Sequence, residues 1–97
     1  MEVRQSITFE KWLRRLRDLR AAAIIARRID RLGEGYLGDV KPVGDGVSEL
    51  RVNYGPGYRV YFVRRGEAWI MLLCGGDKSS QSRDIAAAKI AAKELGT

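Results

Sequence analysis

The chain has 97 residues, the size of one domain with one modest core, so residues 1–97 are treated as a single domain. Apolar residues make up 45% and charged residues 31%, a balance that excludes an intrinsically disordered chain. The formal net charge of +6 makes a phosphate backbone or an acidic protein the natural complementary partner.

The residue types exclude several kinds of chemistry. The chain has no histidine, so Ser-His-Asp and Cys-His nucleophiles and zinc sites that use histidine are ruled out. Its one cysteine, Cys74, cannot form an internal disulfide, which fits a reducing compartment. The longest apolar run, 68–74, is far shorter than the roughly 20 residues that cross a bilayer. We expect a cytoplasmic protein with no secretion signal, membrane contact, metal or cofactor.

The N-terminal third predicts a short edge strand followed by two helices. Residues 3–6 are extended, and Thr8 is the expected cap of a helix that begins at Phe9. Asp18 is the expected cap of a second helix, which Gly33 ends. The short connection predicts an antiparallel helical hairpin. Helical spacing defines the apolar stripes, formed by Phe9, Trp12, Leu13 and Leu16 in the first helix and by Ile25, Ile29 and Leu32 in the second.

The positive charge is concentrated in this helical region. Residues 1–32 contain nine Lys or Arg and four Asp or Glu, a net charge of +5, whereas residues 66–97 are neutral. Most of these cations lie off the apolar stripes. They form either a surface for an acidic partner or an ordinary solvated helical face.

The middle of the chain predicts a loop and then a three-stranded meander. Residues 33–48 are rich in glycine and form a connection, with a short extended piece at 40–43. Residues 49–54 and 58–65 alternate between apolar and polar side chains, as half-buried strands do. Residues 68–74 are continuously apolar, which is typical of a strand buried on both faces.

The last part of the chain predicts a glycine break and a helix. Gly75 and Gly76 are expected to end the third strand, and a helix to start near Ser79 or Ser80. The order is therefore β-α-α-β-β-β-α. It predicts an α+β domain in which helices cover one face of a small, mainly antiparallel sheet. The other face is expected to stay open and to present four side chains, Glu49, Arg51, Arg59 and Tyr61, with Lys78 at the corner.

Several blocks in this order resemble one family. They are Leu37–Pro42, Val47–Arg51, Gly55–Phe62 and Leu73–Gln81, followed by Asp84–Ile85. The chain closely resembles the RelE/ParE superfamily of bacterial toxins, and most of all its phage-derived Gp49-like, HigB-type branch. The resemblance implies a RelE-like fold.

The resemblance also implies the toxin of a type II toxin-antitoxin (addiction) module. RelE and HigB toxins enter the ribosomal A site and cut messenger RNA without a metal, which inhibits translation. ParE toxins poison DNA gyrase, and a relative that only binds its antitoxin is a further alternative. The implied partners are a HigA-like helix-turn-helix antitoxin, the ribosome and messenger RNA. Operator DNA is reached only through the antitoxin complex.

Four residues are the expected catalytic set. Arg59 lies where the family places a catalytic arginine, and we expect it to stabilise the charge of the phosphate. Arg51 is expected to converge on the same phosphate if the two strands pair. Glu49 is either the base or a carboxylate that orients an arginine. Lys78 is expected to contact the scissile phosphate.

Four further residues are expected to bind RNA. Tyr61 and Tyr58 offer rings that stack on unpaired bases. Lys41 adds a phosphate contact, and the free backbone N–H of Ser79, at the start of the last helix, is expected to hold phosphate.

Overall fold

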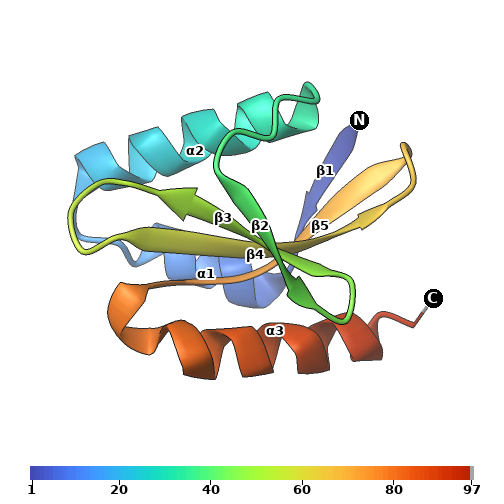
Figure 1. Ribbon diagram of the computed structural model, residues 1–97. Helices are drawn as coiled ribbons and strands as arrows, with labels where there is room; N and C mark the ends of the chain where they lie inside the picture. The colour runs from blue at the N-terminus through green and yellow to red at the C-terminus, as the bar shows by residue number, and fades with distance from the viewer. Residues whose placement is uncertain (97) are drawn as a thin grey trace.

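The computed structural model describes residues 1–96 as a five-stranded sheet with helices on both sides (Figure 1). The strands lie in the order β1-β5-β4-β3-β2. The elements are β1 (Glu2–Gln5), α1 (Ile7–Arg14), α2 (Leu19–Gly33), β2 (Val40–Gly44), β3 (Val47–Val52), β4 (Tyr58–Arg65), β5 (Trp69–Asp77), the 3-10 turn η1 (Lys78–Ser80) and α3 (Gln81–Glu94).

The predicted α+β class and the mainly antiparallel sheet are confirmed. Strands β2 to β5 pair antiparallel, and only β1 pairs parallel, with β5. The predicted order lacked one strand, because the extended piece around Val40 is a true edge strand that pairs with β3. None of the helices described within residues 1–96 is long and apolar enough to cross a membrane.

The helix starts follow from local capping. Asp18 caps α2 as predicted, because its Oδ1 accepts hydrogen bonds from the backbone N–H groups of Arg20 and Ala21. The predicted Thr8 cap is wrong. Ser6 caps α1 instead, with its Oγ accepting from Phe9 N at 3.0 Å, so the helix begins earlier.

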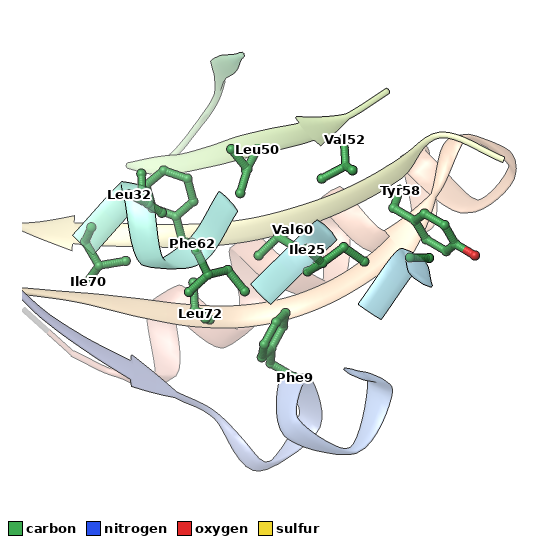
Figure 2. Packing of buried hydrophobic residues seen from close by; sticks show 12 residues of the cluster. Phe9, Ile25, Leu32, Leu50, Val52, Tyr58, Val60, Phe62, Ile70 and Leu72 are labelled. Atoms are coloured by element: carbon green, nitrogen blue, oxygen red, sulfur yellow. The ribbon is translucent and has the colours of Figure 1, made fainter. Parts of the chain in front are cut away.

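The two N-terminal helices both pack on the sheet, and their apolar side chains belong to one cluster. Helix α1 packs mainly on β5, whereas α2 contacts β3. Their apolar stripes meet the sheet in one cluster that includes Phe9, Ile25, Val60 and Phe62 (Figure 2). Each helix therefore buries its stripe in a cluster shared with the strands, which removes apolar surface from water.

The opposite face of the sheet is not open, which corrects the prediction. Figure 1 shows α2 and α3 on opposite sides of the sheet. Helix α3 covers a second cluster that includes Val47, Tyr61, Leu73 and Ala88. The central part of the meander is consequently buried on both faces.

Strand β5 is an interior strand of the sheet and is longer than predicted. It lies between β1 and β4, which explains its continuous apolar run. An irregularity in the β4–β5 pairing sets Tyr61 opposite Cys74 but Phe62 opposite Leu72. Neighbouring residues of a regular strand point to opposite faces, but Leu73 and Cys74 both pack in the cluster under α3. The bulge explains this arrangement. The strand then continues through Gly75 and Gly76, which do not break it.

Candidate phosphate-binding site

A buried carboxylate is the centre of the site. Glu49 in β3 is fully buried. Its Oε1 accepts a hydrogen bond from Arg51 Nε at 3.0 Å. Its Oε2 accepts from Tyr61 OH at 3.0 Å and from Gln81 Nε2 at 2.8 Å. Arg59 Nε lies 3.9 Å from the same oxygen. Two arginines, a phenol and an amide thus surround one negative charge.

Strand register assembles these groups. In the β3–β4 pair Glu49 is opposite Tyr61, and Arg51 is opposite Arg59, so all four lie on one face as their alternation predicted. Gln81 arrives from the first turn of α3, directly after η1. The sheet therefore supplies the charges, and the start of α3 closes the site over Glu49.

The hydrogen bonds hold Glu49 in its charged form. Burial alone would raise the pKa of this carboxyl, but hydrogen bonds from Gln81, Arg51 and Tyr61, with the charge of Arg51, lower the pKa below its ordinary 4.5. A carboxylate with a lowered pKa is a weak proton acceptor. Of the two roles predicted for Glu49, the geometry favours the orientation of arginines over that of a base.

Three cations border an open hollow of about 360 Å³ beside this carboxylate. They are Arg51 from β3, Arg59 from β4 and Lys78 from η1. The Arg59 side chain is only 13% exposed and Arg51 34%, while Lys78 is exposed. The turn at residues 55–57 and Asp39 complete the wall. Cations that converge from three elements on one hollow can bind a phosphate group.

Gly57 permits the close approach of Arg59. The Arg59 Nη1 donates a hydrogen bond to Gly57 O at 2.5 Å. A Cβ atom on Gly57 would lie 2.7 Å from that nitrogen and 3.5 Å from Lys78 Cβ, and the backbone there has a φ of +79°. The Arg59 Nε is buried without a hydrogen-bond partner among the described residues. The charged group nearest to this nitrogen is the Glu49 carboxylate, whose Oε2 lies 3.9 Å away.

The two tyrosines predicted to stack on bases are both buried, which corrects that prediction. Tyr61 lies under α3 with none of its surface exposed, and burial together with the hydrogen bond to Glu49 raises its pKa. Tyr58 is 9% exposed on the opposite face, where its ring meets Trp12 edge-on at 6.3 Å. Both rings pack with protein groups because helices cover both faces of the sheet.

The other two predicted RNA contacts lie outside the hollow. Lys41 is exposed on β2 opposite Glu49, but it does not line the hollow. The backbone N–H of Ser79 is not free, because it donates to Asp77 Oδ1 at 2.8 Å. That bond caps η1, and the hydrogen bonds from the Ser79 side chain and backbone lower the Asp77 pKa.

Sequence reasoning missed two supporting residues. No role in the site was predicted for Gln81, yet its side-chain amide donates a hydrogen bond to Glu49. Arg28 reaches from α2 to donate to the backbone carbonyl of Arg51 at 3.0 Å. Its Nη2 is buried without a partner among residues 1–96. Both contacts join segments far apart in the chain, so no local spacing signals them.

Fold and site define a small α+β protein with a cationic hollow backed by a buried carboxylate. Residues 11–95 match the family of phage-derived Gp49-like proteins (DUF891), and the chain belongs to that family. It is also 49% identical over 96 residues to an uncharacterized protein of Haemophilus influenzae, covering 99% of this chain and 97% of that protein.

Acid is expected to destabilise the protein through Glu49. Because its pKa is lower folded than unfolded, its contribution to stability is complete above about pH 4.5 and is lost as the pH falls through the folded value. The uncharged amide of Glu49→Gln has no such dependence. The difference in free energy of unfolding between wild type and variant, measured in urea from pH 7 to pH 3, should therefore shrink at low pH. A constant difference would contradict the assignment.

Proposed function

We propose that this protein is the toxin of a type II toxin-antitoxin module and cuts messenger RNA on the ribosome without a metal. The observation that carries the proposal is the convergence of Arg51, Arg59 and Lys78 on one hollow beside a buried carboxylate. Membership in the Gp49-like family supports the toxin class. The sequence blocks shared with HigB-type toxins support messenger RNA as the target.

The chemistry needs only RNA and cations. The 2′-hydroxyl oxygen attacks the adjacent phosphorus, the bond to the 5′-oxygen breaks, and a proton passes through water from the first oxygen to the second. The products are a 2′,3′-cyclic phosphate and a 5′-hydroxyl. Arg59 and Lys78 stabilise the negative charge that develops on the phosphorane oxygens, and Arg51 extends the same cationic wall. Glu49 holds the arginines in place.

None of the described side chains that line the hollow is a strong base, which favours a dependence on the ribosome. Lysine and arginine are protonated near neutral pH and accept protons poorly. Such a site gains most of its rate from holding the 2′-hydroxyl in line with the scissile bond. A ribosome that presents a fixed stretch of messenger supplies that geometry. Lys41, on the edge strand, adds a more distant phosphate contact.

The proposed module includes a helix-turn-helix antitoxin of the HigA type. Its complex with the toxin would bind the operator, so the toxin itself would reach DNA only through that partner. The exposed cations of α1 and α2, among them Lys11, Arg14, Arg27 and Arg31, offer a surface for ribosomal RNA or for an acidic antitoxin.

Brief expression in cells followed by mapping of messenger 5′ ends tests the proposal. Wild-type protein should produce new 5′ ends within translated regions, and Arg59→Ala should not. Arg64→Ala is the matched control, because Arg64 is an exposed arginine on the same strand outside the hollow. Intact messages with an SOS response would point to gyrase instead. Intact messages with normal growth would point to a protein that only binds its antitoxin.

A further inference from the structure

Helix α3 has an unusual outer face. A surface helix normally presents polar residues to water and apolar residues to the core. The inner face of α3 buries Ala88 and Ala92, but its outer face also carries Ala86, Ala87 and Ile90. The Ile90 side chain is a large aliphatic group with 62% of its surface exposed. The helix is therefore apolar on two sides, although only one packs on the sheet.

A cleft runs between the C-terminal half of α3 and the β2–β3 turn. Its walls are mainly aliphatic, with Ile90 and Ala92 on the helix side and Gly46 on the turn side. Its charged lining is dominated by cations. The described residues that line it include three cations, Arg65, Lys89 and Lys93, and one acidic residue, Asp45.

We propose that this cleft binds an acidic segment of a partner protein, which places an apolar side chain against Ile90 and carboxylates against Lys89, Lys93 and Arg65. The excess of cations selects a negatively charged ligand. The aliphatic floor selects a peptide over a nucleic acid, because none of the described residues that line the cleft is aromatic and available to stack on a base.

The cleft is distinct from the phosphate-binding hollow. Gln81, at the first turn of α3, bonds Glu49, whereas Ile90 lies nine residues further along the helix, roughly 14 Å at 1.5 Å per residue. The hollow and the cleft share no lining residue. A bound segment would thus occupy a surface apart from the site, and the inference does not depend on whether the protein cuts RNA.

The test uses the full-length protein and a fluorescein-labelled peptide of repeating Leu-Glu-Glu. Fluorescence anisotropy measures the affinity, and changes in amide chemical shifts in two-dimensional NMR locate the binding site. The peptide should bind saturably and shift the amides of Lys89 to Lys93 and of Arg65. Lys89→Glu with Lys93→Glu should weaken binding by on the order of tenfold, because two attractive charges become repulsive. A peptide with Ser in place of Leu should also bind more weakly.

The matched control reverses two charges elsewhere. Arg4→Glu with Arg17→Glu makes the same change of charge at two exposed arginines outside the cleft and outside α1 and α2, and it should leave peptide affinity within about twofold. Both double variants should unfold at the temperature of the wild type. The proposal is overturned if the peptide does not saturate, if its shifts map to α1 or α2, or if a single-stranded RNA oligonucleotide displaces it from the cleft.

Discussion

Replacement of Glu49 by alanine is expected to lower the free energy of unfolding by about 3 kcal/mol and to abolish RNA cutting. The change removes the carboxylate that lies 3.9 Å from Arg59 Nε, whose side chain is 13% exposed, and leaves the buried Tyr61 hydroxyl without its acceptor. Uncompensated buried polar groups are among the most costly defects in a protein interior. Arg59 and Arg51 would also lose the charge that holds them beside the hollow.

Urea unfolding followed by the fluorescence of Trp12 and Trp69 measures this loss. Glu67→Ala is the matched control, because Glu67 lies exposed in the β4–β5 turn, and it should change stability by less than about 0.5 kcal/mol. The isosteric Glu49→Gln should cost less than alanine, since an amide still accepts the Tyr61 hydrogen bond. A loss below about 1 kcal/mol for Glu49→Ala would show that the carboxylate does not anchor the arginines.

Gly75→Ala is expected to destabilise the protein by at least about 2 kcal/mol through overpacking. A Cβ atom at Gly75 would lie 2.3 to 2.6 Å from ring atoms of Trp12, closer than any real contact. That ring also packs against Phe9 and Tyr58, and moving it away from Gly75 would disturb these two contacts. Helix α1 would have to shift away from β5.

A double-mutant cycle identifies the clash as the cause. In a Trp12→Leu background the smaller side chain leaves room for the new methyl group, so alanine at position 75 should cost less than half as much. Urea unfolding of the four proteins, followed by circular dichroism, measures both costs. An equal cost in the two backgrounds would assign the effect to the strand backbone rather than to the Trp12 contact.

The elements themselves were largely predictable. Capping chemistry at Asp18 and the continuous apolar run of β5 are local signals, and both predictions are confirmed. The start of α1 was missed by two residues because Ser6 and Thr8 are both favourable caps in isolation. Ser6 also donates to Leu73 O at 2.7 Å, a contact 67 residues away along the chain. That contact shows that tertiary structure, rather than local sequence, determines which of the two residues caps the helix.

The site was predictable only in part. Alternation along β3 and β4 placed Glu49, Arg51 and Arg59 on one face, because side chains in a strand point alternately to opposite sides. The approach of Lys78 to the turn at Gly57 and the amide of Gln81 depend on where the chain returns after β5. Residue spacing in the sequence does not predict these contacts, because they join segments that are far apart in the chain.

By itself, the sequence determined which residues share a face of the sheet and that the protein is strongly basic. It did not show that α3 covers that face, which was wrongly predicted to stay open. Only the tertiary structure decided that α3 packs over Glu49 and Tyr61. Because of this packing, Glu49 and Tyr61 are buried and support the site from below rather than acting as a base and a stacking ring. Arg51, Arg59 and Lys78 border the hollow that a phosphate can reach.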